Sequence, residues 1–399
     1  MNRNVLVFFG GVSVEHDISI ITGLQTIGAI RQEEKTIKDK KKKELIGLNF
    51  VPVYISRGGG WYTGKQIENI EFLKNFSPVA RGVEKVSLIA GEPCLARFVH
   101  GKYKPFIRVD MAILCNHGRG GEDGSLQGIL SSCKIPQTSC GVLGSAVCMD
   151  KILMKSILKA NGFNQTPCVW FTRMDWLNSQ NETLSKVETL GYPVVVKPSN
   201  LGSSIGISIC ESKENLIEAI NIAEKFDTRI LVEKAVQNLR EFNCSILGNS
   251  SNILVSDVEE PISWEKFLSF EAKYLSNGKL EGMGSSKREF PAKISEELTQ
   301  KIKEESEKAF KVLACKGVVR ADFLFNSETE ELFLNEVNTI PGSLANYFWS
   351  KEGISFQKLI SLMIEYASED FVEENKNIYL FSSKALENFG KGKNKSVKQ

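Results

Sequence analysis

Two short segments near the C-terminal end of this 399-residue chain restrict its fold more than any other feature. Residues 318–325 (VVRADFLF) and 331–338 (ELFLNEVN) both alternate apolar and polar side chains, and the polar stretch NSETE joins them. Alternation with a period of two is typical of a β-strand with one buried face. A short polar connection between two such strands predicts an antiparallel hairpin, which we expect to close about Thr329.

Four polar side chains share one face of this predicted hairpin. In the symmetric register Asp322 lies opposite Glu336, and Arg320 lies opposite Asn338. Carboxylates placed directly opposite each other are destabilising unless a positive charge lies between them. Carboxylate and amide oxygens suit Mg²⁺, so the pattern indicates a metal site. Two alternatives remain open: a solvated face on which Arg320 compensates both acids, and a register slip that would put the acids on opposite faces.

Strand and helix patterns alternate along the rest of the chain, which indicates an α/β protein of two or three domains. Expected strands are 4–9, 50–56, 109–116, 229–236 and 242–247, with a strand, Gly-rich turn and strand over 191–210. Expected helices are 18–30, 150–161, 215–225 and 296–314, and a polar stretch of little periodicity is expected over 256–289.

The pattern of apolar and polar residues changes near residue 140 and again near 241, which indicates a division into domains. The expected units are an N-terminal α/β domain over 1–140, a central lid domain over 141–240, a C-terminal domain with the metal site over 241–370, and a tail over 371–399.

Composition narrows the class of protein. The chain has 42% hydrophobic and 25% charged residues and a formal net charge of +2, which is typical of a globular protein and gives no electrostatic reason to expect a nucleic-acid partner. Neither a signal peptide nor a membrane-spanning run is expected. Nine scattered cysteines and three histidines speak against disulfides and zinc and favour a reducing cytoplasm.

Glycine-rich loops follow two of the expected strands. Lys197 ends an apolar strand and the turn 202–206 (GSSIG) comes next, so backbone N–H groups and a lysine are available to a phosphate. An ordinary hairpin turn with a passing lysine is the alternative. Residues 118–128 (GRGGEDGSLQG) lead into a helix, where backbone donors favour anions, although a capped turn is equally compatible. Neither GxxxxGK[ST] nor GxGxxG is present, so a P-loop and a Rossmann dehydrogenase are disfavoured.

Eight sequence blocks together resemble the D-alanine-D-alanine ligases of the ATP-grasp superfamily. In chain order they are GGVSVEHDISIITG, HGRGGEDGSLQG, MDK (149–151), VVVKPSNLGSSIGIS, LVEKAV, EAKYLS, VVRADF and NEVNTIPGS. The resemblance implies a three-domain ATP-grasp fold with an N-terminal Rossmann-like parallel-sheet domain and ATP held between two antiparallel sheets. It implies a cytoplasmic enzyme, a homodimer, that joins two D-alanines for peptidoglycan synthesis, cell-wall biogenesis and cell shape.

The resemblance also implies roles for individual residues. Two Mg²⁺ ions, replaceable by Mn²⁺, are expected on Asp322, Glu336 and Asn338. ATP is expected to contact Lys151, Lys197, Ser204, Glu233, Lys234, Val236, Glu241 and Lys273. The first D-alanine and the reacting groups are expected to contact Glu15, His117, Ser203, Tyr274, Arg320 and the backbone N–H of Gly342. Three of these residues also have a purely structural explanation. Glu15 could cap a helix, Tyr274 could anchor a loop, and Ser203 could stabilise a turn.

Two departures affect the second substrate. After NTIPG the chain reads SLANYFWSKEG where many members are Thr/Ser-rich, so Ser343 and Tyr347 are both candidates for binding the second carboxylate. Leu201 stands where some members have a charged residue. Lys273 and Tyr274 match the loop of dipeptide-forming members, which favours an amino acid over D-lactate as nucleophile. Ligation to D-lactate or D-serine, another carboxylate-amine ligase, and a nucleotide-binding regulator without turnover remain as rival functions.

Overall fold

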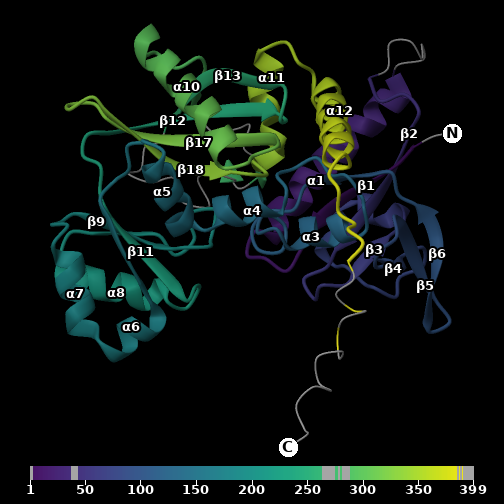
Figure 1. The fold of residues 1–399 in the computed structure, drawn as a ribbon, viewed down its shortest axis with the longest axis horizontal. Coiled ribbons are helices and arrows are strands. Elements are labelled where there is room, and N and C mark those ends of the chain that lie inside the picture. The colour runs from purple at the N-terminus through teal and green to yellow at the C-terminus, as the bar shows by residue number, and fades with distance from the viewer. Residues whose placement is uncertain are drawn as a thin grey trace, which may run out of the picture.

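Three larger β-sheets with their helices are arranged around a common centre in the described part of the chain (Figure 1), and a two-stranded pair is the fourth sheet. The computed structural model describes residues 3–36, 44–262, 275–276, 279–280, 288–383, 386 and 389. Lys273 and Tyr274 and most of the expected 256–289 stretch therefore lie outside the described residues. Among the described helices, none is both long enough and apolar enough to cross a bilayer.

The N-terminal sheet has seven strands in the order β6-β5-β4-β3-β2-β1-β7. Its strands are β1 (Arg3–Gly10), β2 (Leu48–Ile55), β3 (Trp61–Thr63), β4 (Glu84–Leu88), β5 (Cys94–Val99), β6 (Lys102–Arg108) and β7 (Met111–Leu114). Strand β1 is parallel to β2 and β7, which is the expected Rossmann-like part. Strands β3 to β6 extend it as an antiparallel meander that the sequence analysis did not assign. The sheet is thus mixed, and its parallel part is limited to three strands.

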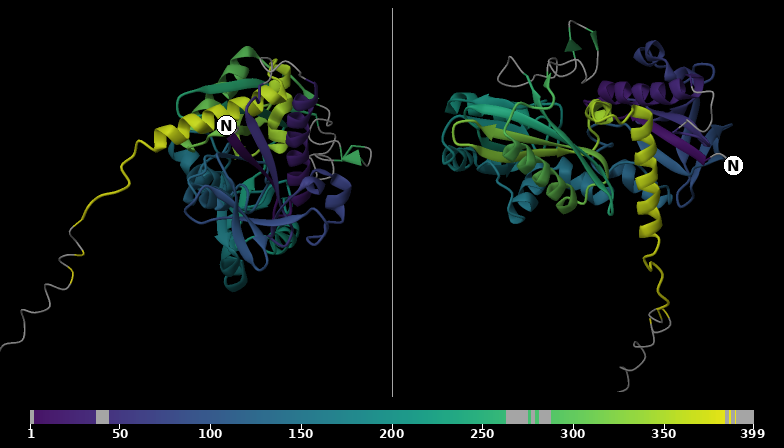
Figure 2. Two further views of the ribbon diagram at one scale, coloured as in Figure 1. Left: turned by 90° about the vertical axis from the view of Figure 1, so that its right-hand side faces the viewer. Right: turned by 90° about the horizontal axis from the view of Figure 1, so that it is seen from above.

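Helices surround this sheet and join it to the end of the chain. They are α1 (His16–Thr36), η2 (Lys65–Glu68), α2 (Ile70–Lys74), α3 (Ser125–Ser132), η3 (Gly342–Ala345), α11 (Asn346–Lys351) and α12 (Phe356–Glu374). Buried side chains of β1, α11 and α12 belong to one hydrophobic core. Helix α12 contacts α1 and α11, and Figure 2 shows its axis crossing that of α1. Helix α12 continues to Glu374 and so crosses the boundary expected at residue 370.

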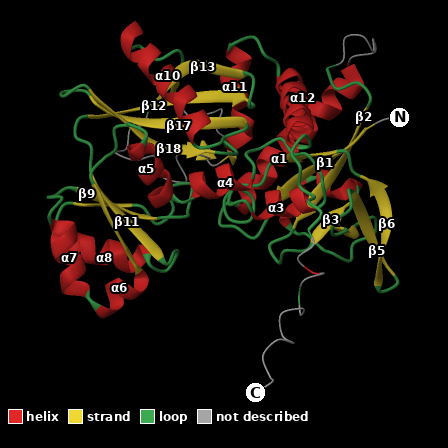
Figure 3. Cartoon of the chain, in the orientation of Figure 1, coloured by secondary structure: helices red, strands yellow, loops and turns green. Residues whose placement is uncertain are grey.

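The central sheet has four antiparallel strands in the order β10-β9-β11-β8 and its own core. Its elements are β8 (Cys168–Thr172), α6 (Arg173–Asn178), α7 (Gln180–Glu188), β9 (Val194–Pro198), β10 (Ser208–Cys210), α8 (Lys213–Ala223) and β11 (Arg229–Lys234). The three helices cover one face of the sheet (Figure 3). Val194, Val196, Ile230 and Val232 point into that core. Since side chains alternate along a strand, Val195, Lys197 and Glu233 face the other way.

The C-terminal sheet has the order β16-β13-β12-β17-β18. Its strands are β12 (Leu239–Gly248), β13 (Ile253–Pro261), β16 (Arg288–Glu289), β17 (Gly317–Asn326) and β18 (Glu331–Asn338), with a separate pair β14 (Leu275–Ser276) and β15 (Lys279–Leu280). Helices α4 (Val142–Met149), α5 (Lys151–Ala160) and α10 (Glu296–Val312) pack on it and share its core.

Two details of this sheet differ from the expectation. Residues 256–261 continue strand β13 instead of opening an irregular stretch. Helices α4 and α5 follow residue 140, yet their buried side chains, including Cys148 and Met154, belong to the core of the C-terminal sheet and not to that of the central one.

Candidate functional site

One cavity of about 1100 Å³ lies where the three units meet. The central sheet contributes Lys197 and Glu233, and the C-terminal sheet contributes Glu241 and Asp322. Every described residue that is expected to contact ATP, metal, the first D-alanine or the reacting groups lines this cavity, whereas Ser343 and Tyr347, the candidates for binding the second carboxylate, do not. The expected residues that line it are Glu15, His117, Lys151, Lys197, Ser203, Ser204, Glu233, Lys234, Val236, Glu241, Arg320, Asp322, Glu336, Asn338 and Gly342.

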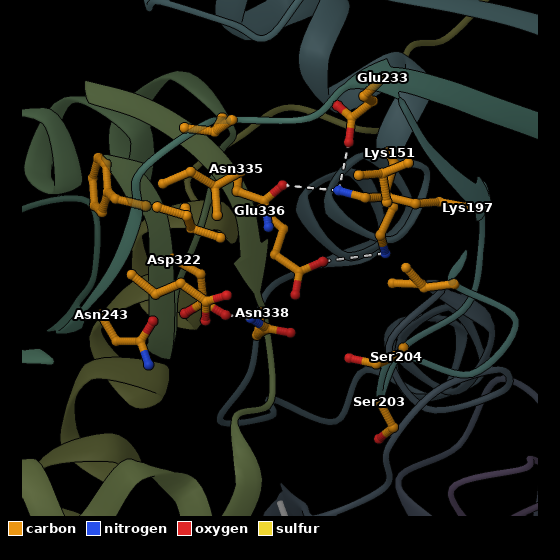
Figure 4. A pocket seen from close by; sticks show the side chains of 18 of the residues that line it. Lys151, Lys197, Ser203, Ser204, Glu233, Asn243, Asp322, Asn335, Glu336 and Asn338 are labelled. Carbon is orange, nitrogen blue, oxygen red and sulfur yellow. Dashed lines mark hydrogen bonds and ion pairs between the residues drawn. The ribbon is translucent and has the colours of Figure 1, made fainter. Parts of the chain in front are cut away.

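The hairpin of β17 and β18 has the expected register at the site but not at its turn. Asp322 pairs with Glu336 and Arg320 with Asn338, whereas Phe323 pairs with Leu334. A β-bulge lies between the two registers, so Asn335 is an extra residue in β18. The bulge lets neighbouring residues share a face: Asn335 and Glu336 both line the cavity, as Figure 4 shows.

The polar face of the hairpin is a connected set of charged groups. Arg320 donates from Nε and Nη2 to the two oxygens of Asp322, both at 2.6 Å. Asn338 donates its amide to Asp322 Oδ2 at 2.9 Å. Glu336 Oε2 lies 3.3 Å from Lys151 Nζ. The attraction of Asp322 outweighs the effect of burial and holds the pKa of Arg320 well above its ordinary value.

These residues suit Mg²⁺ better than a metal that needs a full protein cage. In the part of the chain that the structure describes, no group of three or more His, Cys, Asp or Glu is arranged to hold a metal ion. Asp322 and Glu336 form a pair of carboxylates on one face, with the amide of Asn338 beside them. Mg²⁺ typically takes one or two carboxylates together with substrate phosphates, and each carboxylate has several acceptor positions.

Lys151 is held by the start of helix α5. Asp150 caps the helix, accepting hydrogen bonds from the backbone of Ile152 and Leu153 at 3.0 Å. Its side chain also pairs with Arg229 of β11, which ties the helix to the central sheet. Lys151 Nζ donates to the carbonyl of Leu201 at 2.8 Å, so it reaches the loop that follows β9 as well as Glu336.

Lys197 belongs to a buried charged cluster on the facing sheet. Glu233 Oε1 lies 2.5 Å from Lys155 Nζ, and Glu233 Oε2 lies 2.5 Å from Lys197 Nζ. Burial works against a charged carboxylate, but the two lysines outweigh it and hold the pKa of Glu233 well below its ordinary value. Lys197 Nζ is also 3.1 Å from Asn335 Oδ1, so this lysine bridges the two sheets.

Glu15 and Ser203 meet at the end of the cavity nearest the N-terminal sheet. Ser203 donates its hydroxyl to Glu15 Oε1. Two glycines leave room for this carboxylate: a Cβ on Gly118 would come within 2.6 Å of Glu15 Oε2, and one on Gly202 within 2.7 Å of the same atom. Ser203 and Ser204 both have positive φ, 52° and 58°, which turns the loop toward Glu15. Because the two side chains bond to each other, a helix cap does not fully describe Glu15 and a turn does not fully describe Ser203.

His117 and Glu122 lie beside Glu15. His117 Nε2 is 2.7 Å from Thr22 Oγ1. Burial lowers the pKa of His117 to about 4, so its ring is neutral near neutral pH. Glu122 accepts from the backbone N–H of Gly118 at 2.8 Å and of Ile340 at 3.0 Å. Burial and the charge of Glu15 raise the pKa of Glu122 to about 8.

Gly342 opens a tight turn after β18. Ser343, Leu344 and Ala345 follow it with φ of 54°, 51° and 50°, a left-handed conformation that is costly for residues with a side chain. The backbone N–H of Ser343 donates to Thr22 Oγ1 at 3.1 Å, and Ser343 is buried. The turn therefore fixes Gly342 at the cavity wall but directs Ser343 away from it.

Several residues of the site were not predicted from the sequence, among them Glu122, Lys155 and Asn335. Glu122 lies in the quoted block HGRGGEDGSLQG, which was its only signal. Lys155 follows Lys151 by four residues on helix α5, a spacing that places both on one face. Asn335 had no signal, because a regular strand would have pointed it to the opposite face from Glu336.

Two family models match most of the chain. The model described as "D-ala D-ala ligase N-terminus" matches residues 4–140, and "D-ala D-ala ligase C-terminus" matches residues 157–365. The D-alanine--D-alanine ligase of Thermosipho melanesiensis is 38% identical over 93% of this chain and 95% of its own length. That of Ruminiclostridium cellulolyticum is 36% identical over 92% and 96%.

Two solved structures resemble the fold. The VanG D-Ala:D-Ser ligase from Enterococcus faecalis has a TM-score of 0.75 at 28% identity and covers 92% of this chain and 100% of its own. The D-alanine-D-alanine ligase from Coxiella burnetii has a TM-score of 0.73 at 24% identity, covering 94% and 96%.

Proposed function

The chain belongs to the D-alanine-D-alanine ligase family, and from this premise we propose how its residues divide the work of an ATP-dependent ligation. The enzyme is an ADP-forming ligase that joins two D-alanines into a peptidoglycan precursor. One face of the β17–β18 hairpin supports our assignment most directly. Asp322 and Glu336 are paired there, and they line the same cavity as Lys151 and Lys197.

We assign the nucleotide to the space between the two antiparallel sheets. Lys151 and Lys197 bind the ATP phosphates, joined by the loop residue Ser204. Lys234, the last residue of β11, and Val236 just after it line the adenine end, while Glu241 contacts the ribose. The side chain of Glu233 is enclosed by Lys155 and Lys197, so its part is to hold Lys197 in place.

Asp322, Glu336 and Asn338 would hold two Mg²⁺ ions, with Mn²⁺ as a substitute. When bound, the ions neutralise the phosphate oxygens during phosphoryl transfer. This explains why two acids face each other on a strand pair, an arrangement that is destabilising by itself. Lys151, 3.3 Å from Glu336, keeps this carboxylate directed at the same region of the cavity.

The first D-alanine lies between Glu15, Ser203 and His117. The carboxylate of Glu15 pairs with the substrate ammonium, and the substrate carboxylate points toward the phosphate site. A carboxylate oxygen attacks the γ-phosphorus, the bond to the β-phosphate oxygen breaks, and ADP leaves. The product is an acyl phosphate, which must be kept from water.

The second step forms the peptide bond. The neutral amine of the second D-alanine attacks the acyl carbon, loses a proton, and inorganic phosphate leaves as the tetrahedral state collapses. Arg320 and the backbone N–H of Gly342 stabilise the oxyanion, and one such donor is typically worth about 10²–10³ in rate. Tyr274 and Lys273 keep their expected roles as a prediction, because they lie outside the described residues.

Three further assignments complete the proposal. We propose a cytoplasmic homodimer that has no nucleic-acid or membrane partner. We also keep the division at residues 140, 240 and 370, although α4 and α5 pack with the C-terminal sheet and α12 crosses the last of these boundaries.

An assay of ADP release tests the function. We expect release to depend on D-alanine, and mass spectrometry to identify D-alanyl-D-alanine as the main product when D-alanine, D-serine and D-lactate compete near pH 8. A main product containing D-serine or D-lactate would replace the second substrate and leave the ATP-grasp assignment intact. ADP release that does not change with D-alanine would remove the ligase assignment itself.

A further inference from the structure

Arg288 lines the same cavity as Arg320 and Gly342, although no motif in the sequence marks it. It lies on the short strand β16, where it pairs with Pro261 of β13. Its side chain is only 10% exposed. An arginine that is largely buried in the wall of a substrate cavity needs a partner of opposite charge.

Two neighbours fix the guanidinium of Arg288. Its Nη1 lies 2.8 Å from Glu259 Oε2. The guanidinium carbon lies 4.1 Å from the centre of the Tyr347 ring, which is a cation–π contact. Glu259 is itself buried at 2% exposure, so this support is rigid. A guanidinium has five N–H donors and can therefore serve more than one acceptor.

The two residues expected to bind the second carboxylate do not line the cavity. Ser343 is buried behind Gly342, where its backbone bonds to Thr22. Tyr347 lies beneath Arg288, and burial raises the pKa of Tyr347 to about 12, so it carries no charge at neutral pH. Tyr347 therefore influences the cavity through Arg288, and it is Arg288 that reaches the wall.

We propose that Arg288 binds the carboxylate of the second, attacking amino acid and so selects a nucleophile that carries one. This inference rests on the proposed ligase function. The amine must approach the acyl carbon beside Arg320 and Gly342, and its own carboxylate lies one carbon away. Arg288 is a second guanidinium that lines the same cavity, and guanidinium groups recognise carboxylates through paired N–H donors. Glu259 and Tyr347 act as positioning residues.

Competition between two nucleophiles measures this role directly. The enzyme is given ATP, D-alanine and an excess of D-alaninamide, which has the amine but no carboxylate. The ratio of D-alanyl-D-alanine to D-alanyl-D-alaninamide reports how one acyl phosphate divides between the two, whatever the affinity for the first D-alanine. Because a charged hydrogen bond is lost, we expect Arg288→Met to lower this ratio by about 10- to 100-fold.

Arg97→Met is a matched control in the N-terminal sheet. Arg97 also pairs with a glutamate, Glu84, at 2.8 Å, and also stacks on an aromatic ring, Phe106, at 3.9 Å. We expect its product ratio to equal that of the parent. An unchanged ratio in Arg288→Met overturns the proposal.

If Arg288→Met yields too little folded protein, Arg288→Lys is measured in the same way. Lysine keeps the charge but lacks the fork, so a severalfold lower ratio is expected. An unchanged ratio in this variant also overturns the assignment. Failure of the proposed function would look different, since the parent enzyme would then release no ADP in response to D-alanine.

Discussion

At the scale of single residues, Glu336 has two neighbours that define its task. It pairs with Asp322 across the hairpin and lies 3.3 Å from Lys151. We expect Glu336→Gln to lower the rate of D-alanine-dependent ADP release by at least about 100-fold, because a metal ligand loses its charge. The fold should survive, since the change relieves repulsion from Asp322. Circular dichroism and thermal unfolding give the control, and turnover within tenfold of the parent would remove Glu336 from the metal site.

Glu122 gives the stability of the protein a pH dependence. Its pKa is raised from 4.5 to about 8, so between these values the folded protein keeps a proton that the unfolded chain releases. The contribution of Glu122 to the free energy of unfolding is therefore largest below about pH 4.5 and is lost as the pH rises toward 8. His117 acts in the opposite direction, but only between about pH 4 and its ordinary 6.5. Of these two groups, Glu122 alone titrates above pH 6.5.

Comparison of the parent with Glu122→Gln isolates this effect. From pH 6.5 to 8 we expect the free energy of unfolding of the parent to fall by about 1–2 kcal/mol relative to that of the variant. Urea unfolding at the two pH values is the measurement. Parallel curves for the two proteins would mean that Glu122 is ionised in the folded state across this range.

At the scale of elements, the start of helix α5 carries Lys151 into the cavity. Asp150 caps this helix and also pairs with Arg229. Asp150→Ala should lower the free energy of unfolding by about 1–2 kcal/mol through the lost cap, and further through the unpaired Arg229. Asp150→Asn keeps an oxygen at the cap and should cost less.

Urea unfolding of the two Asp150 variants separates the contribution of the helix cap to stability from that of the ion pair with Arg229. An equal loss in both would assign the whole effect to the pair with Arg229. We also expect a higher KM for ATP in Asp150→Ala, because Lys151 is the first residue of the helix that loses its cap.

The hairpin shows how far local patterns lead at this scale. The sequence predicts the strand pair and its register at the site, because alternation marks the buried face of β17 and β18. It does not predict the bulge at Asn335, because no local signal distinguishes a shift of one residue from a longer turn. Asn335 was consequently not predicted to belong to the site, although it contacts Lys197. The antiparallel strands β3 to β6 were missed because β3 has only three residues, β6 is almost wholly exposed, and the other two are only partly buried, so none shows a clear apolar alternation.

At the scale of the whole molecule, the cavity is formed by faces of sheets that belong to separate cores. The central sheet has its own core, distinct from the two that hold the rest of the described chain. Lys197 and Glu233 of this sheet face Asp322 and Glu336 of the other. The sequence suggests which residues meet here only through resemblance to a family, because contacts between distant segments leave no periodic signal.

Bound nucleotide should therefore join the central sheet to its neighbours. We expect Mg-ATP to slow hydrogen exchange of the amides of β9 and β11, because these strands gain a ligand that contacts the facing sheet as well. At 100 times the dissociation constant the whole protein should gain about 2.7 kcal/mol of stability. Strand β1, buried in another core, is the internal control. Equal exchange of β9 and β11 with and without Mg-ATP would speak against nucleotide binding between the sheets.

The cluster of Lys155, Glu233 and Lys197 imposes an order on evolutionary change. One buried carboxylate serves two ammonium groups, so replacing Glu233 first would leave two positive charges without a counterion in the interior. Lys155 can be lost while Glu233 still pairs with Lys197, and Lys197 has a further contact with Asn335. A lineage that drifts away from this arrangement would therefore begin at Lys155 and reach Glu233 last, so descendants should retain the glutamate wherever either lysine persists.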